Sequence, residues 1–233
     1  MPEKNNLLLE ALPESERQAL APHLTAVDLP QHAVLFDVRD IVTHVHFPTS
    51  AVVSLVIPLS TGETVESAMV GCDGVVGGAA ALNGRVSLNR AIVQIGGGVL
   101  RCPVEPLKEI LKDHSYIRSL IGAHEQALFS QAQQSAACNV THFIESRLCR
   151  WLLRAADLAG THDLPLTQEY IAEMLGVRRT SVTMVARTLQ EAGMIRYARG
   201  NIKLLDIPAL KDSACECYET VKANYAALLH PHK

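Results

Sequence analysis

The stretch "LTQEYIAEMLGVRRTSVTMVARTLQEAGMI", Leu166 to Ile195, predicts two short helices joined by a tight turn. Thr167 is a good N-cap for the first helix, and Gly176 tolerates the positive φ that the turn requires. Val177 would plug the turn from within. The buried side of the first helix is predicted to consist of Ile171, Met174 and Leu175.

The second helix of this stretch has an apolar side and a polar side. Helical spacing turns four residues inward: Val182, Val185, Ala186 and Leu189. The start and the outward side of the helix are basic and hydroxyl-bearing, and comprise Arg178, Arg179, Thr180, Ser181, Thr183, Met184 and Arg187. Such groups suit phosphates and base edges, and a recognition helix enters the major groove by its N-terminal residues. We therefore predict a DNA-reading helix, against the alternative of a helical hairpin whose arginines face water.

The segment "MIRYARGNIKLLD" that follows predicts a β-hairpin turning at Arg199 to Asn201, which would form a wing with Arg199 and Asn201 near DNA. Between Asn139 and Asp206 there are nine cations and seven anions, so this segment carries +2 while the rest of the chain carries −5. Six of the nine cations follow Gly176, where phosphate contacts would need them.

Upstream, between Val27 and Arg101, the sequence changes to short β-branched segments separated by turn residues. Strands are predicted over residues 33–38, 43–48, 51–59, 64–70 and 90–95, with a hairpin turn over Ser60–Glu63. Strands this short and this close indicate an antiparallel sandwich or barrel. The glycine-rich segment 71–78 predicts a loop that bends sharply or approaches another group closely.

A long helix is predicted from about Ser115 to Asn139, ending at an interruption over residues 139–141. Its apolar stripe comprises Ile117, Leu120, Ile121, His124 and Leu128. We expect this stripe to pair with a second copy of the chain, because so long a helix must bury it. Packing on the chain's own sandwich is the alternative.

Two more helices are predicted beyond this interruption. The first ends near Gly160, and its apolar face is predicted to contain Phe143, Ile144, Leu148, Trp151, Leu152 and Ala155. The second is a tail helix over residues 209–229, expected to dock on the helix-turn-helix domain through Leu210, Ala214, Tyr218, Val221 and Tyr225.

This order of β sandwich, long helix, hinge and "LTQEYIAEMLGVRRTSVTMVARTLQEAGMIRYARGNIKLLD" resembles the bacterial CRP/FNR superfamily of transcription factors, over nearly the whole chain. The resemblance implies an α+β fold: an antiparallel β-roll (double-stranded β-helix or jelly-roll) sensor over 1–113, a dimerisation helix over 114–138, a winged helix-turn-helix domain over 139–207 and a tail helix over 208–233. It implies a homodimer in which each subunit reads half of a palindromic operator, with RNA polymerase as a further partner.

The resemblance also assigns roles on the recognition helix. Arg179, Thr180 and Met184 would read bases, while Ser181 and Arg187 would contact phosphates. The family's usual reading residues are replaced in part by Arg178 and Thr180, so the operator sequence is not implied.

An effector pocket is implied in the sensor, with Gly77, Gly78, Ala79, Asn89, Arg90, Ala132 and Gln133 as its candidate residues. Aligning "VVGGAAAL" and "NRAIVQ" with the family's cyclic-nucleotide cassette puts Gly78 at the glutamate position and Asn89 at the arginine position. Two charge-assisted contacts, each worth about 1.5–3 kcal/mol, are then missing. Cyclic AMP in the usual pose is not expected, and the effector stays unknown. Arg85 or Arg90 could meet an anion or face solvent.

Other cofactors find little support in the sequence. An iron-sulfur cluster of the family's N-terminal type is not expected, because no cysteine precedes Cys72. Haem or metal ligation by His44, His46 or His124 is not expected either, since hydrogen-bonded neutral imidazoles are commoner. The six cysteines show no C-x-x-C pair, so buried thiols are predicted, with oxidation near the hinge, at Cys138 or Cys149, as an alternative.

With 233 residues and 48% hydrophobic content, the chain has ample material for packed cores. Neither a signal peptide nor a membrane-spanning run is predicted, so we expect a cytoplasmic protein. Nothing assembles a nucleophile with a base or a phosphate loop, so an enzyme is not expected. Three functions stay open: a ligand-gated DNA-binding regulator, a regulator that binds DNA without ligand, and a nucleotide-binding or enzymatic module whose C-terminal domain contacts proteins.

Overall fold

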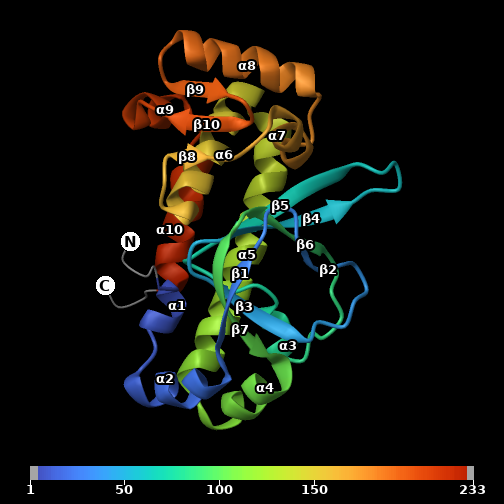
Figure 1. Cartoon of the computed structure of the whole chain (residues 1–233), viewed down its shortest axis with the longest axis vertical. Helices are drawn as coiled ribbons and strands as arrows, with labels where there is room; N and C mark the ends of the chain where they lie inside the picture. The colour runs from blue at the N-terminus through green and yellow to red at the C-terminus, as the bar shows by residue number, and fades with distance from the viewer. Residues whose placement is uncertain (1–4, 230–233) are drawn as a thin grey trace.

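A computed structural model describes residues 5–229 and shows a β-roll at one end, a helical domain at the other and a long helix running between them (Figure 1). The N-terminal part contains α1 (Leu7–Glu10), α2 (Glu14–Leu20), β1 (Thr25–Leu29), β2 (Val34–Phe36), β3 (His44–Pro48), β4 (Val52–Pro58), β5 (Thr64–Val70), α3 (Gly78–Ala81), β6 (Arg90–Ile95), β7 (Gly97–Pro103) and α4 (Val104–Asp113). The remainder contains α5 (Ser115–Thr141), α6 (Ile144–Ala159), β8 (Asp163–Leu164), α7 (Gln168–Leu175), α8 (Arg179–Glu191), β9 (Ile195–Ala198), β10 (Asn201–Leu204), α9 (Ile207–Ser213) and α10 (Cys217–Leu229).

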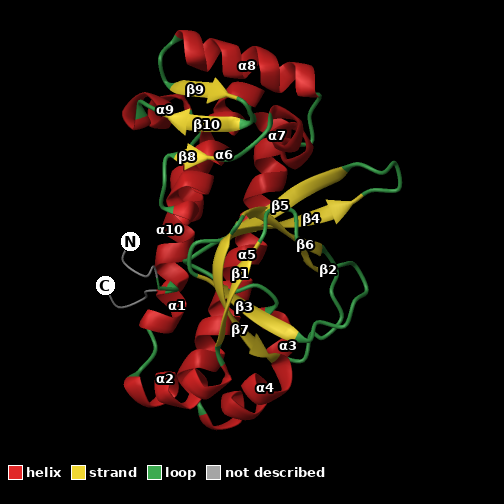
Figure 2. Ribbon diagram, viewed as in Figure 1, coloured by secondary structure: helices red, strands yellow, loops and turns green. Residues whose placement is uncertain are grey.

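The β-roll consists of two antiparallel sheets, ordered β1-β7-β3 and β2-β6-β4-β5 (Figure 2). Side chains of both sheets, among them Phe47 and Val93, meet in one apolar core. The predicted α+β class with an antiparallel roll is confirmed, and all five predicted strands are present. Strands β1 and β7 were not predicted. In β7 the strand pattern is weakened by the two glycines at its start.

The glycine-rich loop behaves as its composition indicates. Gly77 has φ +80°, and Gly78 opens the single turn of α3. A Cβ placed on Gly74 would lie 2.3 Å from His124 Nε2, so only glycine permits this approach to α5.

Helix α5 corrects one prediction. The expected dimer stripe, Ile117, Leu120, Ile121, His124 and Leu128, is buried within this single chain, where its apolar members join the core of the β-roll. The alternative, that the stripe packs on the chain's own sandwich, holds for these residues. The reason is geometric: the roll offers α5 an apolar sheet face at close range, and a helix buries its widest apolar face first.

The break after α5 also lies later than predicted. Helical backbone continues through Asn139 and Thr141, and the chain turns at His142 and Phe143, whose φ and ψ are extended. Phe143, expected on the buried face of α6, is 88% exposed, because it stands outside the helix as its N-cap. The other predicted face residues are buried or half-buried, and α6 ends at Gly160 with φ +61° as expected.

The tail differs from the single helix predicted. It divides at Ala214, whose extended ψ of 152° ends α9, and α10 begins at Cys217. Leu210 and Tyr218 pack in the core of the helical domain, as predicted, but Val221 and Tyr225 join the core of the β-roll. The tail therefore runs from one domain to the other along α5 and α6 (Figure 1).

Polar contacts also join the two domains. Arg154 of α6 forms a largely buried ion pair with Asp73, 2.8 Å apart, and its guanidinium lies 4.9 Å from the centre of the Tyr225 ring. Trp151 Nε1 donates to Glu66 Oε1 over 3.0 Å. Burial raises the pKa of Glu66 to about 7.

Candidate nucleic-acid interface

The first helix of the motif forms as its sequence dictates. Thr167 Oγ1 accepts a hydrogen bond from Tyr170 N at 3.2 Å, the capping interaction that starts α7. Gly176, with φ +62°, ends the helix, and Val177 packs half-buried against the domain core. A backbone carbonyl of this turn, that of Leu175, accepts from the buried guanidinium of Arg147, so α6 fixes the turn in place.

Helix α8 separates its faces as predicted. Val182, Ala186 and Leu189 are buried, and Val185 is half-buried. The side chain of Met184 is 71% exposed. The remaining predicted contacts are exposed, or half-buried in the case of Ser181: Arg178, Arg179, Thr180, Ser181, Thr183 and Arg187. In Figure 1 this helix lies at the outer end of the molecule, with open space along its far side.

The arginines of α8 are held by weak surface pairs. Arg179 lies 3.3 Å from Glu169, and Arg187 lies 2.7 Å from Glu191, with all four side chains mostly exposed. The hydrogen bond with Glu191 raises the pKa of Arg187. Exposed pairs of this kind contribute little to stability, so a phosphate can displace either carboxylate at little cost.

The wing is a hairpin of β9 and β10, and its turn lies where the sequence predicted it. Arg199 and Gly200 both have positive φ, of 50° and 78°, and Asn201 donates to Asp163. Arg196 and Lys203 are directly opposite each other in register, and both are exposed. Like charges placed opposite destabilise a hairpin, so this pair favours an anionic partner. The wing contacts predicted from the sequence did not include these two residues, although the charge count did.

Two of the candidate effector residues, Gly78 and Ala79, contact α5. A Cβ at Gly78 would lie 2.9 Å from both Ile121 and the carboxylate of Glu125, and Ala79 N donates to that carboxylate over 3.0 Å. Helix α5 therefore packs directly on this loop. The candidate residues come from the glycine-rich loop, the beginning of β6 with the residue before it, and α5: Gly77, Gly78, Ala79, Asn89, Arg90, Ala132 and Gln133.

Both candidate arginines of the sensor are paired with a carboxylate. Arg90 binds Asp37 through both Nε and one terminal nitrogen, at 3.1 and 2.7 Å. Arg85 lies 3.1 Å from Glu105. Arg85 remains 45% exposed, so it is solvated as well as paired, whereas Arg90 is 34% exposed and is held by two hydrogen bonds to Asp37.

The histidines considered for haem ligation have different surroundings. His44 and His46 lie on one face of β3, as predicted, and line a cavity of about 450 Å³ with Arg101. His124 accepts from Val75 N over 3.4 Å and meets the edge of Tyr225. Burial lowers the pKa of His46 and of His124 to about 4, so both imidazoles are neutral at pH 7.

Comparison with known proteins agrees with this geometry. Residues 146–213 match the family model of the Crp-like helix-turn-helix domain. This match lies in the part of the chain that contains α7, α8 and the wing. The domain match is to a DNA-binding class and not to an enzyme, in agreement with the sequence interpretation. No curated protein sequence matches the chain.

Several solved structures share the fold of most of the chain. FixK2 from Bradyrhizobium japonicum has a TM-score of 0.70 at 16% identity, covering 82% of this chain and 98% of its own. CLP of Xanthomonas campestris, described as a c-di-GMP responsive global regulator, gives 0.67 at 14% identity, covering 83% and 100%. A CRP/FNR-family transcriptional regulator from Thermus thermophilus gives 0.64 at 23% identity, covering 82% and 98%. Within residues 5–229, none of the helices combines the length and hydropathy needed to cross a bilayer.

Proposed function

We propose that the chain is a homodimeric, sequence-specific transcriptional regulator that inserts α8 into the major groove of a palindromic operator. The observation that carries this proposal is the exposed outer face of α8, where cationic and hydroxyl groups are not covered by the rest of the described chain. In this function Arg179, Thr180 and Met184 read base edges. Ser181, Arg187 and the wing bind phosphates, and RNA polymerase is a further partner in the cytoplasm.

The second copy of the chain is proposed to pack on the outer face of α5. With the inner stripe buried, a second row at heptad spacing stays exposed or half-buried: Ser119, Gly122, Gln126, Phe129, Gln133, Ala136 and Val140. Phe129 and Val140 are 64% and 87% exposed, and nothing lies within 4 Å of a Cβ placed on Gly122. Large apolar side chains beside small ones permit close helix approach, and alternating steps of three and four residues are the spacing of a two-helix seam.

A regulator that binds DNA without a small ligand is the second candidate. The packing of Gly78 and Ala79 against Glu125, and the pairing of Arg90 with Asp37, support this candidate, because these residues are then engaged within the chain. Folded protein freed of small molecules by extensive dialysis without chelators distinguishes the candidates: full operator affinity supports ligand independence, and recovery only with cell extract supports gating.

Selection of bound duplexes from random DNA, followed by fluorescence anisotropy over a salt series, tests the proposed function. We expect a palindrome whose half-sites lie about 34 Å apart. Arg187→Ala should weaken binding to every sequence alike and reduce the salt slope by about 1. Arg17→Ala is the matched control, because Arg17 forms a similar exposed pair with Glu14 on α2 in the sensor. Equal effects of the two substitutions would contradict the assignment.

A further inference from the structure

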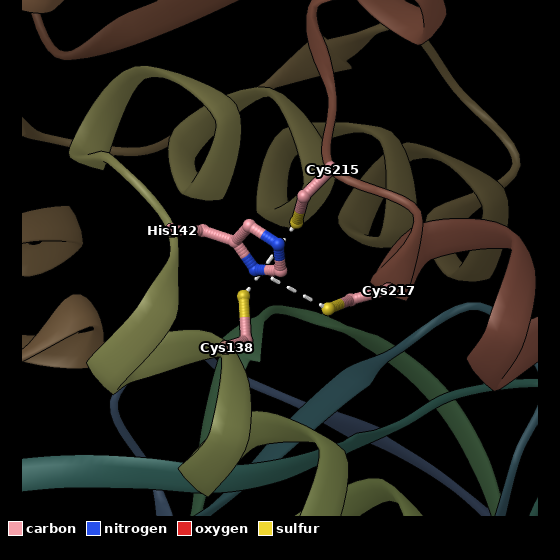
Figure 3. Close-up of side chains that lie close together, drawn as sticks. All are labelled: Cys138, His142, Cys215 and Cys217. Carbon is pink, nitrogen blue, oxygen red and sulfur yellow. Dashed lines mark hydrogen bonds between the residues drawn. The ribbon is translucent and has the colours of Figure 1, made fainter.

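Four metal-binding side chains meet where α5, α6 and α10 join. Cys138 belongs to the last turn of α5, and His142 is the first residue of the hinge. Cys215 lies between α9 and α10, and Cys217 begins α10. Figure 3 shows the three sulfurs and the imidazole pointing toward one another from these separate segments.

The ligand atoms have the separations of a single tetrahedral metal ion. All four lie within 4.8 Å of one another. The Sγ atoms of Cys138 and Cys215 are 3.6 Å apart, and Cys217 Sγ lies 3.6 Å from His142 Nδ1. Zinc bonds of about 2.3 Å to sulfur and about 2.0–2.1 Å to nitrogen give tetrahedral edges of about 3.8 and 3.6 Å. An iron-sulfur cluster binds its ligands through different irons and needs them further apart.

The surroundings of the cluster suit a thiolate site. The three cysteines are buried and form a small core of their own, apart from the two large apolar cores. His142 Nε2, the other ring nitrogen, lies 3.2 Å from Glu216 Oε1. A carboxylate on the outer nitrogen orients a zinc-bound histidine and strengthens it as a ligand. Gln134 Nε2 donates to Cys217 Sγ over 3.0 Å, which would stabilise a thiolate.

We propose that Cys138, His142, Cys215 and Cys217 bind one zinc ion as a structural Cys₃His site. Binding would release the thiol protons to solvent and leave three thiolates and a neutral imidazole around Zn²⁺, with a net charge of −1. The guanidinium groups of Arg147 and Arg150 on α6 act on Cys138 electrostatically and offset this charge. The closed set of four protein ligands leaves no open position for catalysis.

The spacing explains why the sequence did not reveal this site. The ligands occur as C-x₃-H and C-x-C, more than 70 residues apart, and neither is the C-x₂-C pair that usually signals zinc. The structure unites them because α10 returns along α5 (Figure 1). A disulfide between Cys138 and Cys215 would use only two of the four groups and give no role to Cys217 or His142.

A zinc ion here would fix the hinge between the sensor and the DNA-binding domain. It would link the end of α5 to the segment between α9 and α10. The link lies at His142 and Phe143, the two residues between α5 and α6. This consequence rests on the proposed function. Loss of zinc should therefore lower operator affinity, by about 5- to 150-fold if the coupling is of ordinary allosteric size.

The test begins with full-length protein purified under reducing conditions without added metal, analysed for metal content and by X-ray absorption. We expect one zinc per chain with three sulfur ligands and one nitrogen. Zinc content near zero, an iron-sulfur absorption spectrum or a Cys138–Cys215 disulfide in the reduced preparation would each overturn the proposal. These measurements involve no DNA, so zinc bound by a protein that ignores every duplex would refute only the proposed function.

Substitutions assign the ligands and their support. Cys217→Ser should abolish tight zinc binding, while Cys102→Ser, an equally buried cysteine of β7, should retain it. Glu216→Gln should lower zinc affinity by about 10- to 100-fold in a chelator competition and leave the ligand set unchanged. This milder variant keeps the test decisive should Cys217→Ser not fold, and unchanged affinity in Glu216→Gln would contradict the proposed support by that carboxylate.

Discussion

Helices α5 and α8 both carry an apolar row at helical spacing, but the two rows have opposite relations to their surroundings. On α8 the apolar row faces its own small domain, and the polar remainder faces open space. On α5 the more apolar row packs in the core of the β-roll, and a second, less apolar row faces outward. Helical periodicity therefore predicts the faces of a helix but does not predict which part of the molecule each face packs against.

The largest expected effect concerns the inner row of α5. Ile121→Ala should destabilise the chain by about 2–5 kcal/mol, because it leaves a cavity in the core shared with the sheets. Gln126→Ala, on the outer row, should change stability by no more than about 0.5 kcal/mol. Urea unfolding measures both. A small effect of Ile121→Ala would mean that the inner row is not core.

Acidification should weaken the contribution of this same inner face of α5 to the stability of the fold. His124 has a pKa of about 4 in the folded chain against 6.5 in a free side chain, so its neutral form stabilises the fold above pH 6.5. That contribution is lost as pH falls, by about 2 kcal/mol at pH 5. The groups around His124 are Asp73, Arg154 and Tyr225. His124→Gln should reduce the loss of unfolding free energy between pH 7 and 5.

The pH dependence of stability due to Glu66 has the opposite sign. Its pKa is raised to about 7 from 4.5, so its contribution is present at low pH and is lost as pH rises from 4.5 to 7. Glu66→Gln should therefore increase the loss of stability on acidification. The same series of urea titrations measures it. If both variants changed the loss of unfolding free energy between pH 7 and 5 in the same direction, one of the two burial effects would be misassigned.

The outer row of α5 should govern self-association instead of folding. Phe129→Glu would place a carboxylate from each copy in the proposed seam, and we expect the dimer dissociation constant to rise by about 10- to 100-fold, or about 1.4–2.8 kcal/mol. Sedimentation equilibrium measures this. Leu88→Glu is the control, because Leu88 is 83% exposed in the sensor, away from α5. An unchanged dimer would place the seam elsewhere.

The smallest effect is expected in the wing. Arg196→Ala should remove one phosphate contact and reduce the salt slope of operator binding by about 1. It should also relieve the opposition to Lys203, a gain of about 0.2–1 kcal/mol in unfolding free energy. Lys211→Ala, an exposed cation of α9 in the same domain, controls for net charge. A decrease in stability without any change in slope would remove Arg196 from the interface.

The local parts of the fold followed from the sequence because their signals are local. Thr167, Gly176 and the spacing of Val182 and Leu189 each act within one or two helical turns, and the structure confirms all of them. The wing turn at Arg199 is likewise a short-range feature.

The parts that failed depend on contacts distant in the chain. Nothing near Ile121 in sequence says that a sheet formed some 70 residues earlier will cover it. Nothing near Cys217 says that the tail returns to Cys138. Arg90 likewise forms an ion pair with Asp37, which lies 53 residues earlier in the sequence. Residue type and period cannot supply such pairings, which the packed topology alone determines.

DNA reading by the outer face of α8 can be tested by measuring operator affinity for all single base-pair substitutions with the original chain and with Arg179→Ala. We expect Arg179→Ala to cost about 1–3 kcal/mol on the best operator and to remove discrimination at one base pair in each half-site, leaving the other positions as before. An affinity profile that Arg179→Ala leaves unchanged at every position would contradict this expectation.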